Sequence, residues 1–341
     1  SLPARWGGLG IRSAVLLAPS AYLASAASTK ELASSLLPVR LRDAVDSGIE
    51  PATSAWLRLA HYPLQSSPTA IPTSIARRSW DDPCCKAHAD MLLDSAVDHV
   101  VRARLLAARS PGSGDWLEAL PLSSVGNKID NATVRIAAGL RLGAPIVCPH
   151  VCVCGKTVAV EGHHGLSCRF GSGRHSRHNQ INDVLRRAFI KSGSLATREP
   201  NSLCNGSGKR PDGVTQVPWS RGRCLAWDAT CPDTFAVSHV QDSSTRAESA
   251  AAAAEVLKSQ KYADITTGVD FVPVAIETSG TWGEQAIDFV KEIGRRIAEA
   301  THEPRSVAFL RQRLSIAVQR GNAFCILGTF RGTDSVVSVG D

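Results

Sequence analysis

Residues 209–230 decide the fold that the sequence predicts; they read KRPDGVTQVPWSRGRCLAWDAT. β-Branched and aromatic residues are concentrated in Val214–Trp219 and Cys224–Thr230, as is typical of strands. If these segments pair as neighbouring strands, Asp212 at the start of the first lies beside Asp228 in the second. Two carboxylates next to strand carbonyl oxygens are hard ligands that suit Mg²⁺. We therefore expect a magnesium site here, where the metal would polarise a phosphodiester and help to generate a hydroxide.

A metal site of this kind needs a nearby cation to stabilise the negative charge that develops on the phosphate. The position two residues after Asp228 is Thr230, so the cation must come from elsewhere in the chain. Lys258 and Lys261 lie in the alanine-rich segment 244–262, which predicts a long helix. These two lysines are therefore the candidates for the catalytic cation.

The segments around this stretch predict an α/β fold. Helical periodicity is present in 180–190, 244–262, 283–300 and 306–319, the last ending at Gly321, and Phe271–Thr278 predicts a third strand. The order helix, strand, strand, helix, strand, helix is an α/β order. Residues 1–145 predict mostly helices, including Asp90–Ala107 and one with Asn131 as its N-cap, and residues 65–85 predict a loop.

Cysteine and histidine are concentrated upstream of residues 209–230. Within 21 residues the chain carries four of its ten cysteines and three histidines, and the candidate ligands among them are Cys148, Cys152, Cys154, His163, His164 and Cys168. This density favours a metal site in a reducing compartment over disulfides. Four of the six suit a tetrahedral Zn²⁺, which would fix a segment too short to build its own core. Cys154-x8-His163-x4-Cys168 has zinc-knuckle spacing and His164-x3-Cys168 is an equal alternative, so the sequence leaves the set of four open.

Basic residues are concentrated in the same part of the chain. The net charge is +7, and residues 156–223 contain 12 Lys and Arg against 4 Asp and Glu. A polyanion is the natural partner of such a stretch, because each neutralised phosphate releases a counterion. The nucleic-acid contacts that we expect from this stretch include Arg186, Arg187, Lys209 and Arg210. A hydrophobic content of 43% excludes a fully disordered chain, and no apolar run approaches the about 20 residues of a membrane span.

Taken in order, these motifs resemble the C-terminal part of a non-LTR (LINE-type) retrotransposon polyprotein with a restriction-enzyme-like, PD-(D/E)xK-like endonuclease. The features that carry the resemblance span nearly the whole chain: Leu2–Ile11, the Cys/His segment, Arg177-His178-Asn179, Lys209–Asp212, Asp228 and Lys258–Tyr262. The resemblance implies a helical post-polymerase region at 1–145 and a CCHC zinc-knuckle segment at 146–172. It places a restriction-like endonuclease domain at 173–330 and a tail at 331–341.

The family implies a Mg²⁺-dependent DNA endonuclease that nicks chromosomal DNA, so that the polymerase can extend the freed 3′ end on element RNA. The implied partners are target DNA, element RNA and the polymerase portion of the same polyprotein, with no membrane, in a nuclear location. The paired aspartates of the polymerase are absent here, so no DNA synthesis is expected from these residues. The alternative is a DNA- and RNA-binding module whose catalytic site has degenerated.

The resemblance also assigns roles to single residues. It implies that Asp212 and Asp228 bind the divalent metal. It implies that Lys258 is a displaced catalytic lysine, with Lys261 beside it. The residues that it assigns to nucleic-acid contact are Arg177, His178 and Asn179, at the entry of the basic helix.

Overall fold

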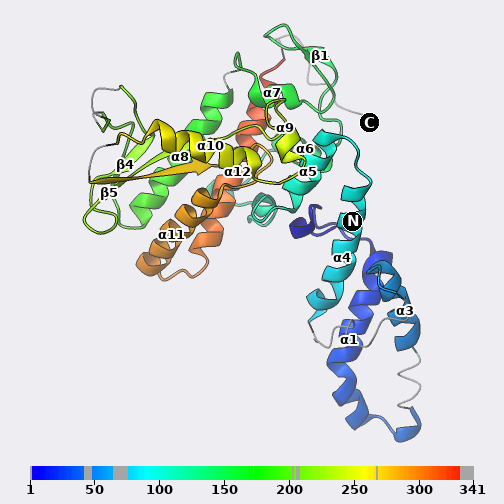
Figure 1. Ribbon diagram of the computed structural model, residues 1–341. Helices are drawn as coiled ribbons and strands as arrows, with labels where there is room; N and C mark the ends of the chain where they lie inside the picture. Colours follow the sequence, from blue (N-terminus) through cyan, green and yellow to red (C-terminus); the bar gives the residue numbers. More distant parts are fainter. Residues whose placement is uncertain are drawn as a thin grey trace. The chain divides into compact units, whose positions relative to one another are not determined.

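The computed structural model describes residues 2–41, 48–63, 76–171, 173–201, 203–204, 208–265 and 268–330 (Figure 1). The chain forms two compact units, Ser1–Val97 and Asp98–Asp341. Helices and strands are both present, so the predicted α/β class is confirmed at the level of a mixed α/β fold.

The first unit is helical. Its elements are the short 3-10 turn η1 (Ala4–Trp6) and the helices α1 (Ala14–Leu36), α3 (Ile49–Leu59) and α4 (Arg77–Asp94). Trp56 and Trp80 pack edge to face with ring centroids 5.5 Å apart, at the centre of a small core. The predicted loop over 65–85 is wrong for residues 77–85, because α4 accommodates Pro83 within the helix. Residues 65–75 lie outside the described residues.

The predicted helix Asp90–Ala107 is two helices. α4 ends at Asp94, and α5 (His99–Arg109) begins in the second unit. The carboxylate of Asp98 accepts a hydrogen bond of 2.9 Å from the backbone N–H of Val101. An aspartate in this position caps a new helix N-terminus, which explains the interruption.

The second unit contains the remaining elements. Its helices are α5, α6 (Asn131–Leu142), α7 (His163–Ser167), α8 (Gly173–Lys191), α9 (Val240–Ser243), α10 (Ser249–Lys261), α11 (Glu284–Thr301) and α12 (Ser306–Leu327), with 3-10 turns η3 (Asp115–Leu117) and η4 (Ser123–Val125). Its strands are β1 (His150–Val151), β2 (Thr157–Val158), β3 (Ala196–Arg198), β4 (Gly213–Thr215), β5 (Cys224–Thr230) and β6 (Val269–Ala275).

Four of these strands form one sheet in the order β3-β4-β5-β6. β4 pairs antiparallel with β5, as the sequence predicts, whereas β5 and β6 run parallel. β4 is shorter than predicted and β3, which pairs with it, was not predicted. Gly213 lies opposite Trp227 at the start of β4, so Asp212 immediately precedes the paired residues.

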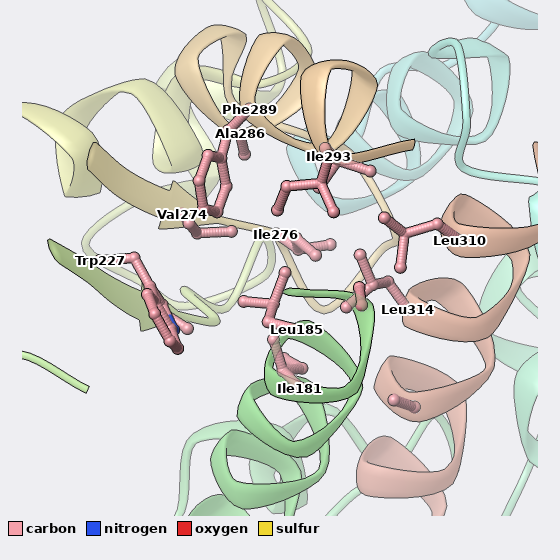
Figure 2. Packing of buried hydrophobic residues seen from close by; sticks show 14 of the residues in the cluster. Ile181, Leu185, Trp227, Val274, Ile276, Ala286, Phe289, Ile293, Leu310 and Leu314 are labelled. Atoms are coloured by element: carbon pink, nitrogen blue, oxygen red, sulfur yellow. The ribbon is translucent and has the colours of Figure 1, made fainter. Parts of the chain in front are cut away.

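The main core lies between this sheet and three helices. Leu225, Trp227 and Ala229, alternate residues of β5, face α8, α11 and α12. Figure 2 shows Leu185 of α8 and Leu314 of α12 in this core. Because successive side chains of a strand point to opposite faces, Asp228 is directed away from the core that buries Trp227.

Helix α12 continues to Leu327, so the predicted end at Gly321 is wrong. A Cβ atom at Gly321 would lie 2.4 Å from the Cβ and Cγ atoms of Arg177 on α8. The glycine is therefore explained by the close approach of two helices, not by a helix end.

The N-cap of α6 is Asp130 rather than the predicted Asn131. The Asp130 carboxylate accepts hydrogen bonds from the hydroxyl and the backbone N–H of Thr133, at 2.7 and 2.9 Å, and these bonds lower the pKa of Asp130. We expect Asp130→Ala to lower the free energy of unfolding by about 1 kcal/mol in urea denaturation of the full chain. Asp288→Ala, on an exposed position of α11, should change it by less than about 0.5 kcal/mol. Equal effects of the two substitutions would contradict the capping role.

Candidate functional site

Asp212 lies where the sheet meets α8. Its Oδ2 atom accepts hydrogen bonds from His178 Nε2 at 2.8 Å, Asn182 Nδ2 at 2.9 Å and the backbone N–H of Ala229 at 2.7 Å. His178 and Asn182 are one turn apart, so one face of α8 holds this carboxylate. Asn182 is itself held, because its Oδ1 accepts a 3.0 Å hydrogen bond from Trp227 Nε1.

These contacts control the protonation of Asp212. Burial alone would raise the pKa of Asp212, but the hydrogen bonds and the charge of His178 outweigh it and lower the pKa below its ordinary value. Conversely, the hydrogen bond to Asp212 raises the pKa of His178 against the effect of burial. The pair therefore favours a carboxylate and an imidazolium.

Asp228 lies in the middle of β5 with a side chain that is only 4% exposed, and α10 provides its partners. Lys258 Nζ forms an ion pair with Oδ1, and the Tyr262 hydroxyl lies 2.6 Å from Oδ2. Lys261 Nζ is 4.0 Å from Oδ2 and 3.0 Å from the Tyr262 hydroxyl. Both lysines predicted from the sequence thus reach this carboxylate, Lys258 by the closer contact.

The two carboxylates belong to one site. The backbone N–H of Ala229, the residue after Asp228, donates a hydrogen bond of 2.7 Å to Asp212 Oδ2. The two carboxylates also act on common neighbours. The negative charge of Asp228 helps to raise the pKa of His178, which is the partner of Asp212. Burial and the contact with Asp228 raise the pKa of Tyr262, and the charge of Asp212 adds to this effect. We call Asp212, Asp228, Lys258, Lys261, His178, Asn182 and Tyr262 the acidic site.

Arg177 does not face the surface, which corrects the expectation that it contacts nucleic acid. It is 3% exposed, and its guanidinium donates to Asn322 Oδ1 at 2.9 Å and to the Leu166 carbonyl at 3.1 Å. Its neighbour His178 contacts Asp212 instead of projecting freely from the helix. The helical period separates the two roles, since adjacent residues lie about 100° apart around the axis.

The other predicted nucleic-acid contacts lie on or near the surface. Asn179, Arg186, Arg187 and Arg210 are exposed and Lys209 is half-buried. Some already have partners: Asn179 accepts from Arg198, Arg187 pairs with Asp183, and Lys209 pairs with Asp264. Arg186 extends along α8, one turn beyond the Asn182 that holds Asp212.

Asn182 and Tyr262 were not predicted as site residues. Each follows a predicted residue by four positions on a helix, Asn182 after His178 and Tyr262 after Lys258. Residues four apart share a helix face, so this spacing was the available signal. Using it requires knowing which face of each helix meets the sheet, and this depends on tertiary packing.

A second site lies in the Cys/His segment. Ligand atoms of Cys152, Cys154, His164 and Cys168 all lie within 4.8 Å of one another, and we call these four residues the Cys/His cluster. The sulfurs of Cys152 and Cys168 are 3.8 Å apart, and Cys154 Sγ is 3.2 Å from His164 Nε2. Two sulfurs that each lie about 2.3 Å from a tetrahedral zinc are about 3.8 Å apart, so this geometry suits the metal.

Two tight local structures assemble the Cys/His cluster. Cys152 and Cys154 lie at the turn between β1 and β2, where Gly155 adopts a φ of 87° and donates to the Cys152 carbonyl. His164 and Cys168 are four residues apart on α7 and at its C-terminal end, so they share a face. Three cysteines and one histidine could therefore bind a metal such as zinc.

Cys148 and His163, the other two candidates, lie outside the Cys/His cluster. Cys148 is exposed. The His163 ring stacks on Phe235 with centroids 4.3 Å apart, and burial lowers the pKa of His163. His163 thus contributes to the core, and the adjacent His164 provides the ligand atom.

The Cys/His segment is not a separate domain. Leu166, Cys152 and Val158 share a hydrophobic core with Ile136 of α6 and Ile326 of α12. The segment belongs to the same compact unit as α5 and α6, which begins at Asp98. A segment this short buries its apolar side chains by packing on larger helices.

No protein-family model and no curated protein sequence matches this chain. Within the residues that the structure describes, no helix has both the length and the hydropathy that a membrane span requires.

Proposed function

We propose that the second unit is a divalent-metal-dependent DNA endonuclease of a LINE-type retrotransposon polyprotein. The observation that carries the proposal is the linkage of Asp212, through the Ala229 N–H, to the strand that carries Asp228, with which Lys258 of α10 forms an ion pair. Two carboxylates and an amine within one site are the groups that phosphodiester hydrolysis requires.

The oxygen atoms around Tyr262 support a cation at the acidic site. The Tyr262 hydroxyl has one proton, yet it lies 2.6 Å from Asp228 Oδ2 and 2.5 Å from the Arg210 carbonyl oxygen. Carboxylate, hydroxyl and carbonyl oxygens therefore lie close together at this point, and carboxylate and carbonyl oxygens are the ligands that Mg²⁺ prefers. Asp212 and Asp228 would hold the metal, which when bound supplies Lewis-acid polarisation of the phosphate.

Side chains of the acidic site and of α8 would stabilise charge, orient the ligands and bind the DNA. Lys258, whose side chain is 24% exposed, would stabilise negative charge on the phosphate from the solvent side of Asp228. His178 and Asn182 would keep Asp212 ionised and oriented. Arg186 and other exposed cations of α8 would bind the phosphates of the DNA backbone. Such contacts position the DNA and do not depend on its base sequence.

A second candidate function is DNA and RNA binding without cleavage. It is favoured by one observation: both carboxylates already have partners within the chain, Lys258 for Asp228 and the His178–Asn182 pair for Asp212. Carboxylates satisfied in this way bind a metal only if these contacts loosen. The two candidates differ in a single measurable property, which is cleavage.

The test is nicking of supercoiled plasmid DNA by the full chain with and without Mg²⁺. We expect Mg²⁺-dependent nicking, and we expect Asp212→Asn and Asp228→Asn each to slow it on the order of 10³-fold. Asp288→Asn, at an exposed position of α11, is the control and should nick as the unmodified chain does. Nicking by the double variant at the unmodified rate would overturn the proposal. Salt-dependent binding without any nicking would establish the second candidate instead.

A further inference from the structure

Arg177 occupies the meeting point of four segments. Its Nη2 donates to the Leu166 carbonyl of α7 at 3.1 Å and to the carbonyl of Cys231, just after β5, at 3.5 Å. Its Nη1 donates to Asn322 Oδ1 of α12 at 2.9 Å. Asn322 in turn donates to the Thr278 carbonyl at 2.7 Å. One buried guanidinium therefore connects segments that are far apart in the sequence.

Glycines make room for this arrangement. A Cβ at Gly321 would lie 2.4 Å from the Arg177 side chain, and one at Gly173 would lie 2.6 Å from Cys325 Cα. A Cβ at Gly165 would lie 2.9 Å from Ile326 Cα, so α7 also approaches α12 closely. Helices this close cannot shift independently, because protein interiors are densely packed.

Arg177 lies between the two candidate sites. Leu166 lies on α7 between His164 and Cys168, which provide two of the four ligand atoms of the Cys/His cluster. At the other end, Arg177 is adjacent to His178, which holds Asp212 of the acidic site. The Cys/His cluster and the Asp212 carboxylate are thus connected through the Arg177 side chain and the peptide bond between Arg177 and His178.

We propose that Arg177 is a positioning residue that couples metal binding at the Cys/His cluster to the orientation of His178 and Asp212. Metal binding fixes α7 and with it the Leu166 carbonyl, which holds the guanidinium and thereby sets the rotation of α8. The consequence for catalysis rests on the proposed function, whereas the coupling itself does not.

The geometry of the contact requires an arginine. The planar guanidinium donates in several fixed directions, so it can reach Leu166 and Asn322 at the same time. A lysine ammonium is a compact charge on a flexible stem and cannot span both acceptors in this way. Charge and geometry can therefore be tested separately.

The test is amide hydrogen exchange of the full zinc-loaded chain, because the Ala229 N–H donates to Asp212 and reports its position. In Arg177→Met we expect this amide to exchange about tenfold faster, while Val290 in the core of α11 is unchanged. Arg177→Lys should behave like Arg177→Met, and Lys291→Met, at an exposed position of α11, is the control. Zinc removal should accelerate Ala229 exchange relative to Val290 exchange in the unmodified chain, and it should leave this ratio unchanged in Arg177→Met.

Unchanged Ala229 exchange in Arg177→Met would overturn the proposal, as would equal acceleration of Ala229 and Val290, which would indicate a merely structural arginine. Co²⁺ absorption at the Cys/His cluster verifies that each variant folds there. If Arg177→Met does not fold, Asn322→Ala removes one acceptor of the same guanidinium and should give the same selective effect. The readout requires no DNA cleavage, so the coupling and the proposed function can fail independently.

Discussion

Cys154→Ser should lose bound zinc and with it much of the stability of the second unit. Cys154 provides one of the four ligand atoms of the Cys/His cluster, and three ligands hold zinc far less tightly than four. Structural zinc contributes about 10–16 kcal/mol of binding free energy in small zinc peptides, which exceeds the effect of a typical core substitution. Loss of the metal should release α7 and β1 from the core that they share with α6 and α12.

The measurement is zinc content per chain together with thermal unfolding, before and after treatment with a chelator. We expect one zinc per chain in the unmodified protein and a large decrease in Tm on its removal. Cys148→Ser is the matched control, because Cys148 is exposed and lies outside the Cys/His cluster. A zinc loss in Cys148→Ser as large as in Cys154→Ser would contradict the assigned ligand set.

Trp227→Ala should destabilise the second unit by about 3–5 kcal/mol. Trp227 is fully buried, stacks on Phe189 with centroids 4.7 Å apart, and packs on the backbone of Gly213. A Cβ at Gly213 would lie 2.1 Å from the Trp227 ring, so the indole lies over Gly213 on the core face of the sheet. Its removal would leave a large cavity beside Asp212.

Trp227→Phe separates packing from hydrogen bonding. It retains most of the aromatic volume but removes the Nε1–H that donates to Asn182, at an expected cost of about 1–3 kcal/mol. Trp219→Phe, at a half-buried tryptophan next to the same Phe189, is the control and should cost less. Urea denaturation of the full chain measures both, and equal effects would argue against a role for the Trp227–Asn182 hydrogen bond.

Parts of the acidic site could be predicted from local sequence because strand pairing is short-range here. Asp212 immediately precedes β4 and Asp228 lies in β5, and these two strands are consecutive in the sequence and pair antiparallel. The pattern of β-branched and aromatic residues indicated both strands. Lys258 was harder to predict, because it lies 30 positions after Asp228. Residue 230 is a threonine, so the catalytic lysine had to be sought elsewhere, and the following helix offered Lys258 and Lys261. Asn182 and Tyr262 needed knowledge of helix rotation, which no local pattern supplies.

The sequence by itself determined which chemical groups are available and where strands and helices lie, because these depend on residue type and on periods of two and 3.6 residues. It left the choice between His163 and His164 open, and it was wrong about the exposure of Arg177 and about the end of α12. Tertiary structure decided all three, through the Phe235 stack, the Asn322 contact 145 residues away and the close approach at Gly321. Each of these contacts joins segments that are far apart in the sequence. A side chain is buried favourably only where the two packed surfaces fit each other, and local sequence does not determine that fit.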